Sequence, residues 1–159
     1  MTVAYVGLGA NLGEPRRHLE SALEELGALP QTRVTARSGV YRSAPLGYTE
    51  QSDFLNAVAE IDTALLPEKL LNSLQEIEIR HERERPFPGA PRTLDLDLLL
   101  YGDAEIDTPE LQLPHPRMHQ RAFVLKPLLE LDPAIAIPRK GTARELLAAC
   151  GAQRVEPAD

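Results

Sequence analysis

The sequence predicts an α+β fold in which helices pack on an antiparallel β-sheet. Three observations support this prediction: β-rich apolar runs, two segments of helical periodicity between them, and proline and glycine clusters that separate the segments. The chain has 159 residues, of which 43% are hydrophobic. This size and composition are typical of one compact globular unit, so we expect a single domain over residues 1–159.

The N-terminal segment predicts a strand followed by a helix. Residues Thr2–Leu8 form a short, β-rich apolar run, and three glycines indicate that the strand turns near its end: Gly7, Gly9 and Gly13. Pro15 suits the first position of a helix, and apolar residues then recur at helical spacing until Gly27. We therefore expect a helix between these two residues.

Two strands and a second helix should come next. The strands are expected over Arg33–Arg42 and Asp53–Thr63, with a connection rich in turn formers between them. Pro67 opens the helix, and its buried stripe should consist of three apolar residues: Leu70, Leu74 and Ile77. Gln75 and Glu78 lie three residues apart and should share a polar face beside that stripe.

A proline-rich run then ends the second helix. Residues 85–91 include three prolines, which lack a backbone donor and clash with the preceding turn, so we expect a mobile loop. Leu94–Tyr101 follows as a strong strand. The order is strand, helix, strand, strand, helix, strand, which is the split βαβ order of ferredoxin-like folds. In such folds an antiparallel sheet carries its helices on one face.

The remaining chain is less regular. Leu111–Leu113 is a candidate strand for pairing with the sheet, and short helical turns are expected between Pro116 and Leu131. Thr142–Cys150 has the pattern of a last small helix.

The charge balance excludes several classes of function. Seventeen basic residues against twenty-four acidic ones give a formal net charge of −7, which is the wrong sign for a nucleic-acid or anionic-membrane surface. No stretch approaches the length of an apolar membrane span. The single cysteine, Cys150, cannot pair within the chain, and the N-terminal residues lack the basic start of a secretory signal. We expect a cytoplasmic protein with neither nucleic-acid nor membrane partners.

A local excess of positive charge interrupts this acidic background. Four arginines stand against two glutamates between residues 80 and 92: Arg80, Arg83, Arg85 and Arg92. The planar donor fork of arginine suits phosphate oxygens, so the cluster is able to hold a small polyanion. A solvated helix end would have the same composition, and the local pattern leaves both interpretations open.

Two aspartates inside the strand after the proline-rich run are the clearest chemical signal. Aspartate is a poor strand former, yet Asp95 and Asp97 interrupt a favourable run. Strand alternation puts both carboxylates on one face, about 6.5–7 Å apart, and turns Leu96 and Leu98 into the core. Such a pair can bind a hard cation or bridge two Mg²⁺ ions, although one solvated strand face would show the same pattern.

Carboxylates beside an arginine cluster suit phosphoryl transfer from a nucleotide, where positioning and charge neutralisation dominate. The sequence contains no Walker loop, and the glycines between residues 7 and 13 miss the dinucleotide fingerprint by one residue. His115 and His119 have a spacing that can bind zinc on a helix, but no third ligand is evident.

The segment PRTLDLDLL at residues 91–99 resembles the signature of the 6-hydroxymethyl-7,8-dihydropterin pyrophosphokinase family of folate biosynthesis. Further motifs in the family's order extend the resemblance over nearly the whole chain: VGLGANLG at 6–13, YRSAPLG at 41–47, FLNA at 54–57, QEIE at 75–78, PHPRM at 114–118 and RAF at 121–123. The resemblance implies transfer of a pyrophosphoryl group from ATP to the hydroxymethyl group of a reduced pterin, with release of AMP. It also implies two Mg²⁺ ions.

The same resemblance implies roles for individual residues around the phosphates. Asp95 and Asp97 would hold both metal ions and, with Arg83 and Arg92 as phosphate clamps, would form the catalytic group. The contacts to ATP would come from five residues: Gln75, Arg83, Arg92, His115 and Arg121.

The implied pterin site is aromatic and amide-lined. The pterin would lie between Phe54 and Phe123, because an offset sandwich holds a flat heterocycle well. Asn56 would read the polar edge of the pterin with a donor and an acceptor, helped by backbone groups near Ser43 and Leu46.

Two alternatives use the same residues. One is another Mg²⁺-dependent phosphotransferase or nucleotidyltransferase acting on a different acceptor. The other is a non-catalytic module that binds a small regulatory molecule, since a ferredoxin-like fold does not determine function. We expect a monomer whose partners are small-molecule substrates, ATP and the reduced pterin.

Overall fold

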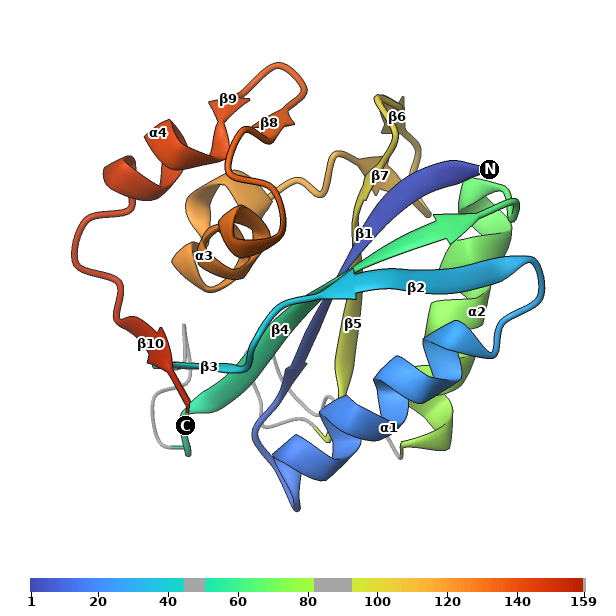
Figure 1. Cartoon of the computed structure of the whole chain (residues 1–159), viewed down its shortest axis with the longest axis horizontal. Coiled ribbons are helices and arrows are strands. Elements are labelled where there is room, and N and C mark those ends of the chain that lie inside the picture. The colour runs from blue at the N-terminus through green and yellow to red at the C-terminus, as the bar shows by residue number, and fades with distance from the viewer. Residues whose placement is uncertain (45–50, 82–92, 159) are drawn as a thin grey trace.

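The computed structural model of the chain describes residues 1–44, 51–81 and 93–158. Within these ranges the main sheet has the strand order β10-β3-β4-β1-β5, and β2 pairs with a further stretch of β4 (Figure 1). All of its pairings are antiparallel. The strands are β1 (Thr2–Ala10), β2 (Thr32–Arg37), β3 (Tyr41–Ser43), β4 (Phe54–Thr63), β5 (Asp95–Tyr101) and β10 (Val155–Pro157). With β2 and β3 taken as one interrupted strand, this is the predicted ferredoxin-like arrangement.

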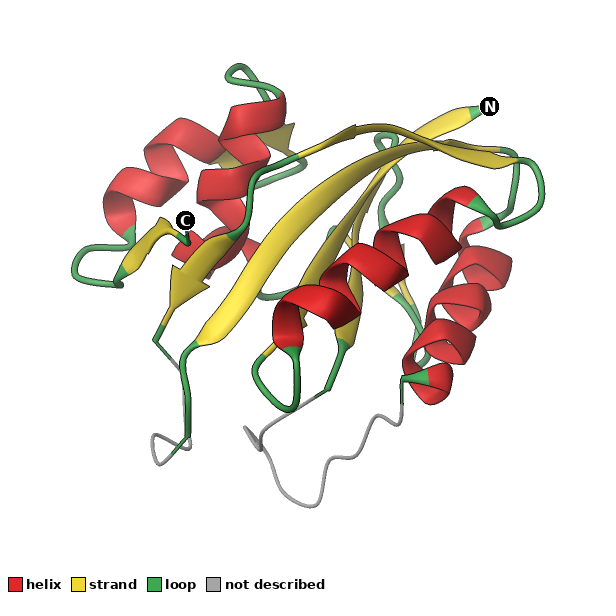
Figure 2. Ribbon diagram, turned by 60° about the horizontal axis from the view of Figure 1, so that its bottom comes forward, coloured by secondary structure: helices red, strands yellow, loops and turns green. Residues whose placement is uncertain are grey.

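Helices α1 (Pro15–Gly27) and α2 (Pro67–Arg80) cover one face of the sheet (Figure 2). Both helices begin with proline, as predicted, because the first helical position needs no backbone donor. The predicted stripe of α2 is confirmed, since its three apolar residues are fully buried: Leu70, Leu74 and Ile77. They pack with Val6 and Leu8 of β1 into one apolar cluster.

The opposite face of the sheet is covered only in part. The 3₁₀ turn η1 (Met118–Gln120) and the helices α3 (Ala122–Leu131) and α4 (Ala143–Ala149) form this second layer. Leu125 and Leu128 of α3 pack with Val58 and Leu99 in a second cluster. The last small helix is present as predicted, whereas the short helical turns expected between Pro116 and Leu131 are a 3₁₀ turn and a ten-residue helix. Together these helices add a layer beyond a sheet with one covered face. Among residues 1–44, 51–81 and 93–158, no helix covers the rest of this second face.

One predicted strand is wrong in its extent. The continuous strand expected over Arg33–Arg42 is two strands, because the chain leaves the ladder at Ser38. The buried Ser38 hydroxyl accepts a hydrogen bond from the Val58 amide at 2.9 Å and donates to the Gly39 carbonyl at 2.7 Å. A side chain thus satisfies a β4 amide that a continuous neighbouring strand would otherwise engage.

Short pairings complete the fold away from the main sheet. Leu111–Leu113 does not join that sheet as expected: β7 (Gln112–Leu113) pairs with β6 (Ile106–Asp107) in a separate two-stranded ladder. The strands β8 (Ala136–Ile137) and β9 (Gly141–Thr142) form another. The loop predicted over residues 85–91 lies outside the described residues. Among the described helices, none has the length and apolar character needed to cross a membrane.

Candidate active site

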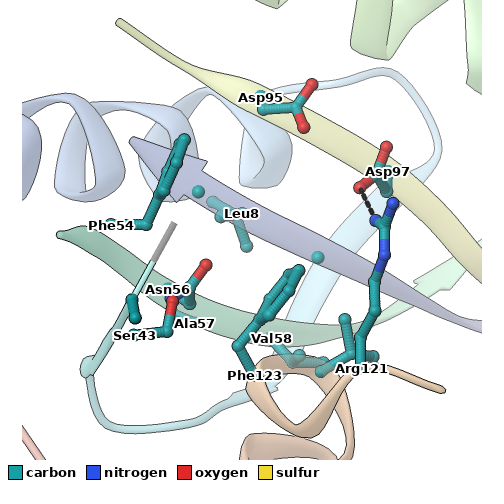
Figure 3. A pocket seen from close by; sticks show the side chains of 14 residues that line it. Leu8, Ser43, Phe54, Asn56, Ala57, Val58, Asp95, Asp97, Arg121 and Phe123 are labelled. Carbon is teal, nitrogen blue, oxygen red and sulfur yellow. Dashed lines mark hydrogen bonds and ion pairs between the residues drawn. The ribbon is translucent and has the colours of Figure 1, made fainter. Parts of the chain in front are cut away.

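The open part of the second face holds a hollow of about 700 Å³, counting the solvent at its mouth. It lies over β1, β3, β4 and β5, and the start of α3 forms one of its walls (Figure 3). Its lining residues are Gly7, Leu8, Gly9, Ser43, Ala44, Phe54, Asn56, Ala57, Val58, Asp95, Asp97, Arg121, Phe123 and Val124.

Two glycines of β1 form the floor of this hollow. Gly9 pairs with Asn56 on β4 and with Asp95 on β5, and Gly7 pairs with Val58 and Asp97. A Cβ atom on Gly9 would lie 3.3 Å from the Asn56 Oδ1 atom. The expectation that these glycines turn the chain is wrong, because both lie inside the strand. Their period-two spacing was the signal that they share one strand face.

Asp95 and Asp97 both face the hollow from β5 (Figure 3). Leu96 and Leu98, which alternate with them, are only 5% and 4% exposed in the core. The predicted separation of faces is therefore confirmed. Since β5 is an end strand of the main sheet among the described residues, this strand separates the hollow from the outer edge of the sheet.

Glu78 of α2 holds the backbone between these two aspartates. Its carboxylate is buried, 5% exposed, and accepts a 2.7 Å hydrogen bond from the Leu96 amide. The expectation that Glu78 lies on a polar face is wrong. Helical spacing contained the signal, because Glu78 follows the buried Leu74 by four residues and so shares its face.

Two nitrogen-bearing side chains approach Asp97 from the segment after β7. Arg121 Nη1 lies 3.9 Å from one carboxylate oxygen, and His115 Nε2 lies 3.9 Å from the other. The Arg121 guanidinium also lies over the Phe123 ring, with its carbon 5.5 Å from the ring centroid. These contacts gather positive charge and hydrogen-bond donors at the rim of the hollow.

His115 is held in its neutral form. Burial lowers its pKa to about 4, and the positive charges of Arg121 and Arg117 act in the same direction against the opposing effect of Asp95. The Arg117 amide donates to His115 Nδ1 at 3.1 Å. This hydrogen bond assigns the ring proton to Nε2, so His115 presents a neutral N–H donor on the side of Asp97.

The opposite side of the hollow is aromatic and amide-lined. Phe54 and Phe123 stand on either side of it, and between them lies the buried Asn56 (Figure 3). Asn56 Nδ2 donates to Ser43 Oγ at 2.6 Å, which fixes the amide plane. The structure therefore brings together the predicted residues Ser43, Phe54 and Asn56 with Phe123.

A second hollow lies along the outer edge of β5. It is lined by Leu71 of α2, by Leu96–Leu98 of β5, by residues 109–112, and by His115 and Pro116. Asp97 lines both hollows, so they meet at this carboxylate. Gln75 lies on the exposed surface of α2, one turn beyond Leu71, and lines neither hollow.

Three predicted site residues fall outside the described residues: Leu46, Arg83 and Arg92. Within the described ranges, no group of three or more His, Cys, Asp or Glu side chains is arranged to hold a metal ion. The Asp95 and Asp97 pair nevertheless fits Mg²⁺. This ion is usually bound by one or two carboxylates, with water and substrate phosphates completing its shell.

Comparison with known proteins places these features in a family context. Residues 5–133 match the family model described as 7,8-dihydro-6-hydroxymethylpterin-pyrophosphokinase. The chain is 47% identical over 152 residues to a 2-amino-4-hydroxy-6-hydroxymethyldihydropteridine pyrophosphokinase of Pseudomonas aeruginosa, covering 96% of this chain and 94% of that protein. A relative of the same name from Methylorubrum extorquens is 45% identical, with 98% and 100% covered.

Solved structures show the same fold at low sequence identity. A crystal structure of Plasmodium falciparum HPPK-DHPS aligns with a TM-score of 0.73 at 14% identity, covering 93% of this chain and 45% of that one. An HPPK-DHPS in complex with substrates aligns with a TM-score of 0.74 at 12% identity. The chain spans 43% of the length of that second structure, so the likeness concerns one part of the longer proteins.

Proposed function

The chain belongs to the 7,8-dihydro-6-hydroxymethylpterin pyrophosphokinase family, and we propose that its two hollows are the substrate sites of this activity. The enzyme transfers pyrophosphate from ATP to the hydroxymethyl group of 6-hydroxymethyl-7,8-dihydropterin in folate biosynthesis and releases AMP. The observation that carries the site assignment is that Asp97 lines both hollows. A nucleotide in one hollow and an acceptor in the other would meet at Asp97.

The hollow on the sheet suits the pterin. Phe54 and Phe123 offer two aromatic walls for a flat ring, and the glycine floor lets that ring approach the backbone of β1. Asn56, fixed by Ser43, presents its amide to the polar edge of the pterin. A buried amide rejects analogues that lack the matching pattern, because it would be left unpaired. Leu46 completes this proposed pterin site.

The hollow outside β5 suits the nucleotide. His115 lines it, and its neutral Nε2–H donates to a phosphate oxygen without a change in protonation at neutral pH. Arg121 reaches the same carboxylate from the pterin side and contributes a permanent positive charge to the triphosphate. Arg83 and Arg92 complete the proposed phosphate clamp. Gln75 completes the set of proposed contacts to the nucleotide.

Asp95 and Asp97 are the proposed ligands of two Mg²⁺ ions. Held by these two carboxylates, the ions would supply neutralisation of the phosphate charge for the transfer to the pterin hydroxyl. The contribution of the chain itself is rigid positioning: β5 holds both carboxylates on one face, and Glu78 fixes the strand backbone between them. We further propose that the enzyme acts as a cytoplasmic monomer.

A labelled-substrate assay tests the reaction type and the metal requirement together. The protein is incubated with ATP labelled at the β-phosphorus, Mg²⁺ and the reduced pterin, and the products are separated. We expect AMP and a labelled pterin, and no turnover after chelation of Mg²⁺. Formation of ADP would contradict pyrophosphoryl transfer. Comparable turnover with an unrelated alcohol acceptor would favour a different phosphotransferase.

A further inference from the structure

Arg121 occupies a one-residue junction between two helical elements. It follows η1 and precedes α3, and its own backbone is extended, with φ −116° and ψ 106°. Its amide donates to Met118, and its carbonyl accepts from Val124 and Leu125. The backbone position from which the guanidinium extends toward Asp97 and Phe123 therefore depends on how the two peptide groups that flank this single residue are held.

Both flanking peptide groups are held by one side chain from another part of the chain. Gln153 lies in the segment between α4 and β10, and its Oε1 atom accepts from the Ala122 amide at 3.0 Å. Its Nε2 atom donates to the Gln120 carbonyl at 2.8 Å. A single planar amide thus spans Arg121 and ties its two neighbours together.

The local backbone bonds hold the Arg121 amide and carbonyl, but among the described residues they do not engage the outer atoms of the two peptide groups, the Gln120 carbonyl and the Ala122 amide. The Ala122 amide is one of the first four donors of α3, which have no partner inside the helix, and the Arg121 side chain makes no capping bond. Gln153 supplies the cap from outside. Phe123, by contrast, belongs to α3 itself.

The segment that carries Gln153 has other attachments. Lys126 of α3 donates to the Val155 carbonyl at 2.9 Å, and β10 pairs with β3. Upstream of the segment, α4 begins with a capping box between Thr142 and Glu145. Loss of the Gln153 amide should therefore free the Arg121 junction while the segment stays docked.

We propose that Gln153 is a positioning residue that directs the Arg121 guanidinium toward Asp97 during the transfer. This inference rests on the proposed function of Arg121 at the triphosphate. Because misplacement of a charge by about 1 Å can cost up to 10²-fold in rate, the effect should appear in kcat. The pterin KM should change little, since Asn56 is held by Ser43 and the Phe123 side chain belongs to α3, beyond the junction.

A double-mutant cycle tests this inference. The four proteins are the parent, Gln153→Ala, Arg121→Ala and the double variant, and kcat is measured with saturating ATP, Mg²⁺ and reduced pterin. We expect Gln153→Ala to lower kcat roughly 10-fold in the parent and less than about twofold when Arg121 is already alanine. The inference would be overturned if the factors by which kcat falls in the two single variants multiply in the double variant. A kcat equal to that of the parent in Gln153→Ala would also overturn it.

Two further variants separate positioning from general stability. Lys126→Met removes another bond between α3 and the same segment but leaves the Arg121 junction intact, and it should keep the parent kcat. Gln153→Glu keeps an acceptor for the Ala122 amide but sets a carboxylate oxygen against the Gln120 carbonyl, so its kcat should also fall below that of the parent. If Gln153→Ala fails to fold, Gln153→Glu takes its place in the cycle with the same test of coupling. Release of AMP by the parent tests the proposed function separately.

Discussion

Asp97 is the residue where the two hollows meet, and its surroundings make it the strongest single test of the site. Its side chain is 28% exposed and points away from the core leucines beside it. It lies within 4 Å of Arg121 and His115. Function, rather than packing, should therefore depend on its charge.

Asp97→Asn should lower kcat by about 10²–10³-fold, as loss of one preorganised electrostatic contact does, and change the free energy of unfolding by only about 0.5 kcal/mol. Turnover and urea denaturation measure the two effects. Asp103→Asn, an exposed turn residue outside both hollows, is the matched control. A large loss of stability in Asp97→Asn would show that the carboxylate is structural.

A substitution at Gly9 tests whether the glycine floor of the hollow on the sheet is needed for pterin binding. Gly9→Ala places a methyl group 3.3 Å from the Asn56 amide oxygen and inside the hollow. We expect pterin affinity to fall roughly 10-fold, because a well-packed site accommodates an added methyl only with strain, and ATP affinity to stay within twofold. Separate equilibrium titrations with each substrate check this. Equal losses for both substrates would contradict the assignment of the hollow to the pterin.

At the scale of elements, the contact between α2 and β5 joins the helical layer to the active site. Glu78→Ala would leave the Leu96 amide buried without its acceptor, which costs about 1–3 kcal/mol. We expect this loss of stability together with a fall in kcat, because the strand segment carrying both aspartates loses its anchor. Glu76→Ala, at an exposed position of the same helix, should change neither quantity. Loss of stability with full activity would argue against positioning by Glu78.

The contact between α1 and α2 predicts a dependence of stability on pH. Burial by itself would raise the pKa of Glu25, but hydrogen bonds from His81 at 2.6 Å and Arg80 at 3.0 Å outweigh it and lower the pKa below its ordinary value of 4.5. The stabilisation is therefore present above the unfolded pKa and is lost as the pH falls through the folded pKa.

Glu25→Gln should accordingly be less stable than the parent by about 1 kcal/mol at pH 7, and this difference should shrink below pH 4.5. Urea denaturation at several pH values measures it. A difference that grows toward acid pH would have the wrong sign for a depressed carboxyl pKa.

At the scale of the whole molecule, the C-terminal segment links the two layers. Strand β10 pairs with β3, which carries Ser43. The amide of the buried Ala158 donates to the Val40 carbonyl, and its carbonyl accepts from the Arg16 guanidinium. Both apolar clusters lie against the same sheet, so we expect one cooperative unfolding transition, as for a single domain. The single domain over residues 1–159 stays a prediction until this is measured.

Deletion of residues 155–159 should lower stability by roughly 2–3 kcal/mol, because several interlayer hydrogen bonds of about 1 kcal/mol each are lost. Pterin affinity should fall with it, since β3 and Ser43 border that hollow, whereas ATP affinity should stay close to the parent value. Thermal unfolding and the two titrations measure these effects. An unchanged melting temperature would show that β10 does not stabilise the sheet.

The sequence by itself determined the elements whose pattern is local. Alternation in one strand predicted that Asp95 and Asp97 share a face, and helical spacing predicted the buried stripe of α2. The ferredoxin-like order followed from the succession of these elements. The motifs of the family also named the residues around the hollow, including Phe54, Asn56 and Phe123, although periodicity alone does not assign them a ligand.

Only the tertiary structure decided which elements share a site. Asn56 and Asp95 lie on opposite sides of Gly9 because β1 pairs with both β4 and β5, and no local pattern specifies that register. The hydrogen bonds of Glu78 and Gln153 likewise join residues that are 18 and 31 positions apart. Periodicity describes which face of one element is buried, whereas pairing register and contacts between layers depend on packing of the whole chain.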